Sequence, residues 1–385
     1  MNYCLVMSKQ IYSVMQLHQG YNIKPIDVSD LAEQVIKALP QEQYSTTTLF
    51  VSGRPGINQK DSCAQRTIYL NLPRKCLRGL RLGLTYQMYK LFQSEKFDVV
   101  ICNRFKPTSI MMWLYFFVGK PKCITIVHNL SDYRPIMRKL WIRFFARNWN
   151  FVAVSESVRD GLIAMKCGFS GSNVTLIENA LDSEQMSDLL YTKEVSRQRL
   201  DLPMVKTVVG TIGRLEKVKG HVDLIRGFAK IHQKFPDVIV AIIGDGKERK
   251  KLELEIAAKG LAGKVILLGA VDGAAQFIKA FDIWIMPSHS EGLPLALMEA
   301  MTAELPILTT AIPSMKYIVE PSGGVCFDVQ NPDSLAEALS ACLQLTVEER
   351  AEMGKRSLDY LGSRFSLKKY RREYLRLIER VLDDR

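Results

Sequence analysis

Short apolar segments that alternate with helical sequence constrain the fold of this chain more than any other feature. Strands separated by helices are typical of parallel sheets that are covered on both faces. We therefore predict an α/β protein. The predicted strands are residues 3–7, 47–51, 99–102, 123–128 and 151–155 in the first half, and 207–212, 238–243, 265–268, 283–286 and 307–309 in the second, with helices at 27–39, 77–92 and 221–235 among the connections.

The length predicts two domains, because 385 residues are too many for one continuous core. The alternation of strand-like and helix-like segments is interrupted once, at residues 177–182. We expect a Rossmann-like domain over residues 1–182, a second over 183–365 that faces it across a central cleft, and a C-terminal helix over 366–385 that packs back toward the first domain. No short internal repeat is present, which argues against solenoids and propellers.

The composition is that of a soluble enzyme of a reducing compartment. The longest uncharged apolar run, residues 107–119, is shorter than the roughly 20 residues of a spanning helix. The N-terminus reaches Lys9 without a signal-type apolar segment. The eight cysteines include no C-x-x-C pair. We therefore expect a cytoplasmic protein without a membrane span or structural disulfides.

Positive charge is concentrated in the first half of the chain. Residues 1–200 contain 26 Lys and Arg against 15 Asp and Glu, whereas residues 201–385 are almost balanced. A basic face with apolar side chains fits an anionic membrane surface or an acidic acceptor, although a solvated helix face explains each cluster equally well. No nucleic-acid motif accompanies the charge, so nucleic acid is not expected. The two clusters are Arg74, Lys75, Arg78 and Arg81, and Arg138, Lys139, Arg143 and Arg147.

Residues 288–301, after the predicted strand 283–286, read S-H-S-E-G-L-P-L-A-L-M-E-A-M and predict a turn that enters a helix. Pro294 fits the first helical position, which needs no N–H donor. Backbone N–H groups at such a helix start form an anion site, here from Gly292, Leu293 and Leu295.

Two carboxylates flank this helix start. Glu291 precedes the helix and Glu299 lies in its second turn, so the pair can hold two hydroxyl-bearing parts of one ligand. Taken alone, each glutamate is better explained as a capping acid or an exposed helix residue.

A second motif follows the predicted strand 207–212. Gly213 ends that strand, and Arg214 and Lys219 follow in a short loop before the next helix. The planar guanidinium of an arginine can bind two phosphate oxygens at once, and the ammonium of a lysine supplies a compact positive charge. The two side chains together therefore suit a diphosphate. A solvated loop is the alternative explanation for this stretch by itself.

Together the two motifs resemble the retaining glycosyltransferase family four, the group 1 glycosyl transferases of the GT-B fold, of the type that builds bacterial envelope polysaccharide and lipopolysaccharide. Glu291 and Glu299 match the family's E-x7-E signature, and residues 213–220 match its G-R-x-x-x-x-K-G-like loop. The similarity continues at Gly244 and through residues 267–271, so it covers most of residues 200–345.

The resemblance implies a role for each matching residue. Glu291 would bind the hydroxyl groups of the donor sugar, and Glu299 would bind the ribose. Arg214 and Lys219 would bind the diphosphate, with Gly213, Gly244, Gly292, Leu293 and Leu295 completing the nucleotide site and the backbone near Val271 meeting the base.

The N-terminal half resembles the family less closely. Residues 124–129 look like the strand that ends in the family's donor-facing histidine, here His128, although a hydrogen-bonded strand-end histidine would look the same. The glycine-rich loop after the family's first strand is missing after Met7, and Gly20 is the only glycine before position 53. This difference concerns the acceptor side of the cleft.

These features predict a retaining, metal-independent transferase. No D-x-D sequence occurs, so no metal or other cofactor is expected, and Arg214, Lys219 and the helix start would offset the charge of the leaving diphosphate. His128 would orient the donor sugar. The expected donor is a nucleotide diphosphate sugar, and the family resemblance favours UDP-hexose. The expected acceptor is a glycan or glycolipid such as lipopolysaccharide core. The expected location is the cytoplasmic face of the inner membrane.

Other functional classes remain open. A nucleotide-sugar epimerase shares the GT-B architecture but needs no acceptor, and a silent sugar-nucleotide-binding protein would use overlapping residues. A dinucleotide-dependent oxidoreductase would need G-x-G-x-x-G after an early strand, which the chain lacks.

Overall fold

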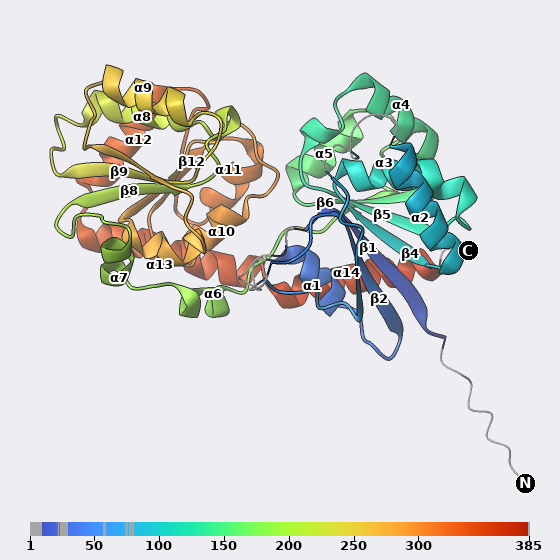
Figure 1. The fold of residues 1–385 in the computed structure, drawn as a ribbon. Coiled ribbons are helices and arrows are strands. Elements are labelled where there is room, and N and C mark those ends of the chain that lie inside the picture. Colours follow the sequence, from blue (N-terminus) through green and yellow to red (C-terminus); the bar gives the residue numbers. More distant parts are fainter. Residues whose placement is uncertain are drawn as a thin grey trace, which may run out of the picture. The chain divides into compact units, whose positions relative to one another are not determined.

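The computed structural model describes residues 10–21, 23, 30–56, 59–73, 76 and 81–383. The predicted strand at residues 3–7 therefore lies outside the described residues, as do Arg74, Lys75 and Arg78. The chain forms two compact units (Figure 1). Unit 1 comprises Met1–Asn179 and Leu367–Arg385, and unit 2 comprises Ala180–Ser366.

Unit 1 contains a parallel seven-stranded sheet of order β3-β2-β1-β4-β5-β6-β7. The order reverses between β1 and β4, and parallel α/β sheets bind ligands at such a switch point. The strands are β1 Tyr12–Gly20, β2 Tyr44–Ser52, β3 Arg66–Tyr69, β4 Val99–Asn103, β5 Lys122–Val127, β6 Trp149–Ala153 and β7 Val174–Leu176. The helices are α1 Leu31–Lys37, α2 Leu82–Ser94, α3 Phe105–Leu114, α4 Ile136–Phe145, α5 Glu156–Ala164 and α14 Leu367–Asp383.

The strand β1 is a correction to the sequence analysis, which did not predict it. Gln16 and His18 interrupt its apolar pattern, yet both are buried. The Gln16 side chain donates to the carbonyl of Ala32. The Nε2 atom of His18 lies 3.4 Å from the side-chain amide nitrogen of Asn103, at the end of β4. The first strand that the structure describes ends on Gly20, whereas the predicted strand at residues 3–7 and the loop after Met7 begin outside the described residues.

Unit 2 repeats the architecture with a parallel six-stranded sheet of order β10-β9-β8-β11-β12-β13. Its strands are β8 Thr207–Ile212, β9 Val238–Ile243, β10 Val265–Gly269, β11 Ile283–Met286, β12 Ile307–Thr310 and β13 Val325–Phe327. Its helices are α6 Ser183–Leu189, α7 Lys193–Arg199, α8 His221–Ile231, α9 Arg249–Ala258, α10 Leu295–Met301, α11 Pro313–Val319, α12 Pro332–Gln344 and α13 Val347–Arg364.

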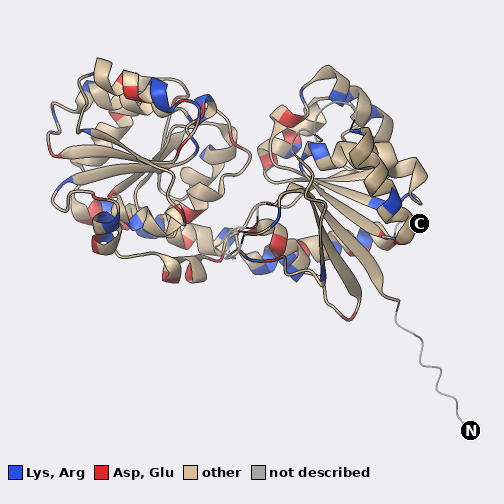
Figure 2. Ribbon diagram, viewed as in Figure 1, with Lys and Arg blue, Asp and Glu red and all other residues tan. Residues whose placement is uncertain are grey.

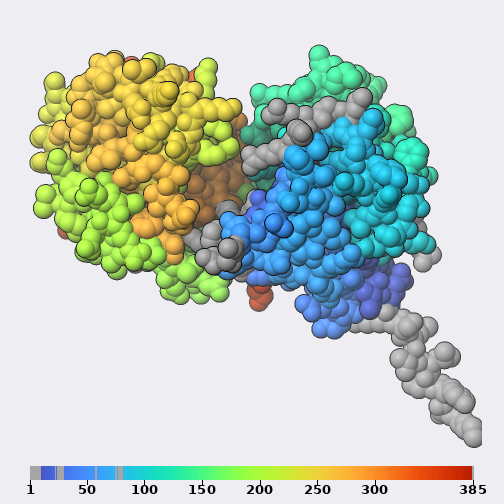
Figure 3. Space-filling view, viewed as in Figure 1, coloured from blue at the N-terminus to red at the C-terminus, as the bar shows by residue number. Residues whose placement is uncertain are grey.

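The core of unit 2 is formed by apolar strand residues and the inner faces of α8, α9 and α12. Val240, Phe228 and Leu335 are completely buried in it. In the space-filling view, residues coloured yellow to orange form much of the visible face of this unit (Figure 3). The strands predicted at 207–212, 238–243 and 283–286 have the bounds that the structure shows. The helix predicted over 221–235 ends earlier, at Ile231.

The C-terminal helix α14 belongs to unit 1. Its Tyr370 hydroxyl donates to the carbonyl of Leu31 at 3.2 Å, and Arg371 donates to the side chain of Gln34 on α1. Tyr370 and Tyr374 are both buried. The boundary between the units, at 179 and 180, lies three residues before the predicted one.

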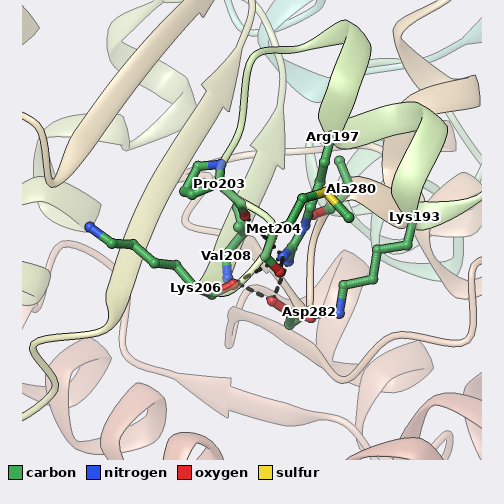
Figure 4. A network of polar contacts seen from close by, with 8 residues as sticks. All are labelled: Lys193, Arg197, Pro203, Met204, Lys206, Val208, Ala280 and Asp282. Atoms are coloured by element: carbon green, nitrogen blue, oxygen red, sulfur yellow. Dashed lines mark hydrogen bonds and ion pairs between the residues drawn. The ribbon is translucent and has the colours of Figure 1, made fainter.

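A buried ion pair fixes α7 to the edge of the unit 2 core (Figure 4). Arg197, whose side chain is only 1% exposed, lies 2.6 Å from the carboxylate of Asp282. Its guanidinium also donates to the carbonyls of Ala280, Pro203, Met204 and Lys206. Asp282 in turn accepts the backbone N–H of Val208 on β8 at 2.7 Å. The pair therefore links α7 to the starts of β8 and β11.

Candidate active site

The acidic motif lies at the carboxyl end of β11. The loop that follows is fixed at two points: the N–H of His289 donates to the carbonyl of Val218, and the hydroxyl of Ser314 donates to the carbonyl of Glu291 at 2.9 Å. The helix α10 begins at Leu295, one residue later than predicted. Pro294 is its N-cap rather than its first residue, because its backbone is still extended, with ψ at 121°.

The structure brings the two sequence motifs together. The ammonium nitrogen of Lys219 lies 2.6 Å from a carboxylate oxygen of Glu291, although the residues are 72 positions apart. Their side chains are 22% and 13% exposed, so water screens this pair only partly. The contact arises because β8 and β11 are neighbours in a parallel sheet, where carboxyl ends meet at one edge.

Two glycines allow the loops at this edge to pack backbone against backbone. Gly220 has a φ of 68°, and a β-carbon there would lie 1.9 Å from the carbonyl oxygen of Pro287. Gly244 has a φ of 148°, and a β-carbon there would lie equally close to the carbonyl oxygen of Gly213. Any side chain would push these loops apart, which explains why glycine occupies both positions.

The other predicted donor residues differ in their exposure. Arg214 is 73% exposed and pairs with Glu216 at 2.7 Å, so its side chain does not join the Lys219–Glu291 pair here. Glu299 and Val271 are partly exposed. Gly292 and Leu293 are buried, and Leu295 is partly exposed. Their roles in binding stay predictions.

In unit 1, His128 directly follows β5 and is partly exposed. Desolvation, and secondly the positive charge of Arg104, lower the pKa of His128 to about 4. The imidazole is therefore neutral at physiological pH and can donate one hydrogen bond and accept another. Its role toward the donor stays a prediction.

Sequence reasoning missed two histidines in the loops of unit 2. His221 begins α8 and is 4% exposed, and its Nδ1 has no hydrogen-bond partner among the described residues. His289 pairs with Asp223 at 2.6 Å through Nε2. The position of His221 directly after Lys219 and Gly220, at the start of a helix, was the signal that could have identified it.

We predict that His221 makes unit 2 less stable in acid. Burial, and secondly Lys219, lower the pKa of His221 to about 4, whereas an unfolded histidine has a pKa of about 6.5. Between these values the unfolded state binds more protons, so the free energy of unfolding falls as the pH falls. From about pH 7 to about pH 5 the loss should approach roughly 2 kcal/mol.

The measurement is urea unfolding of wild type and His221→Gln at both pH values. The variant should show a smaller difference between the two pH values, because glutamine does not titrate. An unchanged pH dependence in the variant would show that His221 is protonated as readily in the folded protein as in the unfolded chain.

Metal-binding clusters and membrane-spanning helices are both absent from the part of the chain that the structure describes. Over residues 10–383, apart from the short gaps stated above, no group of three or more His, Cys, Asp or Glu could hold a metal ion. Within the same ranges, no helix is both long and apolar enough to cross a bilayer.

The protein has two domains with parallel sheets, and in unit 2 a cationic loop and an acidic helix start meet at one sheet edge. These features define a glycosyltransferase of the GT-B fold that uses a nucleotide sugar. The model of the glycosyltransferase family 4 matches residues 28–185, and that of the glycosyl transferases group 1 matches residues 192–359. The chain belongs to the group 1 glycosyl transferases.

Individual relatives support this family. The chain is 23% identical over 323 residues to the UDP-Gal:alpha-D-GlcNAc-diphosphoundecaprenol alpha-1,3-galactosyltransferase of Escherichia coli, covering 81% of this chain and 83% of that protein. It is 27% identical over 214 residues to the lipopolysaccharide core biosynthesis glycosyltransferase LpsE of Rhizobium meliloti, covering 51% and 61%. The crystal structure of HepE from Anabaena with UDP and glucose shares the fold, with a TM-score of 0.77, 18% identity and coverage of 96% and 100%.

Proposed function

We propose that the protein transfers a hexose from UDP-hexose, with retention of anomeric configuration and without a metal ion, to a glycan or glycolipid acceptor of the bacterial envelope, such as lipopolysaccharide core. The Lys219–Glu291 contact carries this proposal, because it joins a diphosphate-binding cation to a sugar-binding carboxylate in one preformed group. The names of the Escherichia coli and Rhizobium meliloti relatives support the envelope acceptor. The UDP and glucose in the HepE crystal support the donor.

Each side chain has a chemical role in this proposal. Glu291 accepts hydrogen bonds from donor sugar hydroxyls, and Glu299 accepts those of the ribose. Lys219 keeps its ammonium in place by donating one hydrogen bond to Glu291, and the other two N–H donors remain for the diphosphate. Arg214, which is exposed and paired with the neighbouring Glu216, can turn toward the same diphosphate at little cost.

The reaction is a substitution on one face of the sugar. The bond between the anomeric carbon and the diphosphate oxygen breaks, and a bond from the same carbon to the acceptor oxygen forms on the same side. The acceptor proton passes to the leaving phosphate oxygen. Arg214 and Lys219 stabilise the negative charge that develops there, and neutral His128 hydrogen-bonds the donor sugar.

A panel of nucleotides and nucleotide sugars tests the donor. A ligand that binds only the native protein raises its thermal midpoint, so UDP and UDP-hexoses should give the largest shifts. NMR of the product then gives the anomeric configuration, which should match that of the donor. Conversion of the UDP-sugar to its epimer without any acceptor would instead identify an epimerase, and binding without turnover would identify a silent binding protein.

We predict that the activity survives EDTA, whereas removal of either cation lowers it sharply. Lys219→Ala and Arg214→Ala should each lose about 2–4 kcal/mol of transition-state stabilisation, which is a decrease in kcat/KM of roughly thirtyfold to a thousandfold. Steady-state kinetics with and without EDTA measure both effects. Lys230→Ala, at an exposed cation of α8, is the control. Complete dependence on added magnesium or manganese would contradict the metal-independent mechanism.

A further inference from the structure

Unit 1 exposes an apolar groove between α3 with the turn that follows it and α4. The groove has a volume of about 440 Å³ and is lined only by aromatic and apolar side chains. Phe117 and Phe144 are 67% and 71% exposed, and Met137 is 66% exposed. Soluble monomers seldom expose a continuous apolar surface of this kind unless something binds it. The lining residues are Met112, Trp113, Phe116, Phe117, Met137, Leu140, Trp141, Phe144 and Phe145.

Ring packing builds the walls of this groove. Trp113 of α3 packs against Trp141 of α4 with ring centroids 4.7 Å apart. Trp141 in turn stacks on Phe145, and Phe116 packs against the same ring at 5.6 Å. The exposed ring of Phe144 packs against Phe145 with ring centroids 5.1 Å apart, so the same cluster of rings holds it at the surface of the folded unit.

A basic hollow adjoins the groove, and the side chain of Phe144 lines both. The hollow has a volume of about 970 Å³, and its cations are Lys122, Arg143, Arg147 and Lys166. Its other polar lining residues are neutral, and none of the described residues that line it carries a carboxylate. The surrounding residues 104–173 contain eleven Lys and Arg against three Asp and Glu, and Figure 2 shows blue segments on α4.

The described members of the two basic clusters differ in their surroundings. Arg138 lies over the ring of Phe105 and donates to the carbonyl of Asp132, and Arg81 donates to the hydroxyl of Ser109. These two arginines therefore serve packing within unit 1. Arg143 and Arg147, from the second cluster, are exposed at the basic hollow.

We infer that the apolar groove and the basic hollow form one docking face for an anionic lipid bilayer. Aromatic rings beside Lys and Arg are typical of segments that lie in the interfacial region, where the rings enter the boundary between headgroups and acyl chains. The hollow then holds lipid phosphates next to the inserted rings. Pairing of two copies through the groove would bring two such hollows together, and this like-charge contact disfavours a dimer.

Vesicle flotation of the full chain, without nucleotide sugar, tests the inference separately from the proposed transferase reaction. The protein should bind vesicles of phosphatidylcholine with about one-third phosphatidylglycerol, should not bind phosphatidylcholine alone, and should be released by high salt. Equal binding to both vesicles, or binding to neither, would overturn the inference.

Two pairs of substitutions locate the face. Arg143→Glu with Arg147→Glu should weaken binding by more than about twentyfold, since each basic residue contributes about fivefold. Phe117→Ser with Phe144→Ser should weaken it by more than about tenfold. The matched controls lie in unit 2: Lys234→Glu with Lys259→Glu for charge, and Leu254→Ser, at a side chain 73% exposed, for apolar area. Equal losses in controls and test variants would overturn the inference.

Tryptophan fluorescence measures insertion directly. Trp113 is 50% exposed, whereas Trp149 and Trp284 are buried. Brominated acyl chains in the anionic vesicles should quench the emission, and Trp113→Phe with Trp141→Phe, which removes both tryptophans of the groove, should remove most of the quenching while binding persists. A concentration-dependent dimer in lipid-free sedimentation velocity that Phe144→Ser abolishes would assign the groove to a second copy instead.

Discussion

Glu291→Gln should lower kcat by two orders of magnitude or more while UDP binding stays measurable. Glutamine keeps the shape of the side chain but removes the negative charge that accepts the sugar hydroxyls and pairs with Lys219 at 2.6 Å. Loss of one preorganised polar contact in an active site costs about 2.7–4 kcal/mol in the transition state. Steady-state kinetics with the donor identified by thermal shift, and calorimetry with UDP, measure the two effects separately.

Two further variants make this result specific. Glu299→Ala should mainly raise the Kd for UDP, because its proposed partner is the ribose. Glu337→Ala, at an exposed glutamate of α12 in the same unit, should change neither quantity. Wild-type kinetics in both Glu291→Gln and Glu299→Ala would show that the donor site is elsewhere.

Arg197→Met should destabilise unit 2 by about 3–5 kcal/mol, the cost of breaking a buried ion pair from one side. The substitution leaves four backbone carbonyls without their guanidinium donor, and Asp282 retains only Lys193 as a cationic partner. Urea unfolding measures the loss. Hydrogen exchange should show that the amides of β8 and β11 lose protection first, since the network joins the starts of these strands.

Lys193→Met provides the control for this prediction. Lys193 also contacts Asp282, but its side chain is 45% exposed, and exposed ion pairs contribute no more than about 1 kcal/mol. Arg197→Lys should lower the free energy of unfolding nearly as much as Arg197→Met, because the ammonium of lysine cannot reproduce the planar set of hydrogen bonds that the guanidinium makes. If Arg197→Met and Lys193→Met were equally stable, the buried pair would not be what holds α7.

The sequence predicted the strands of unit 2 better than those of unit 1, for a physical reason. The central strands β8, β9 and β11 are buried on both faces and almost wholly apolar, so their pattern is continuous. In unit 1, β1 contains Gln16 and His18, whose partners lie on other segments of the chain. No local pattern shows that such polar residues are buried, so the sequence did not predict β1.

The candidate site was predictable where spacing along the chain determines position in space. A strand, a glycine loop and a helix start place Glu291 and Lys219 at one sheet edge. The direction in which Arg214 points and the burial of His221 depend on neighbouring loops, so the sequence did not show them. Spacing likewise did not separate the partly exposed Arg138, whose side chain packs on Phe105, from the exposed Arg143, because both lie on the same helix.

The return of α14 to unit 1 makes unit 2 a domain inserted into another domain. Unit 2 is one continuous segment, Ala180–Ser366, whereas unit 1 is assembled from both ends of the chain. A C-terminal deletion therefore removes part of the first unit, and residues 1–179 alone would lack the helix whose Tyr370 bonds to α1. Exchange of unit 2 between relatives should accordingly use two junctions, at 179–180 and 366–367, rather than a single crossover near the middle of the gene.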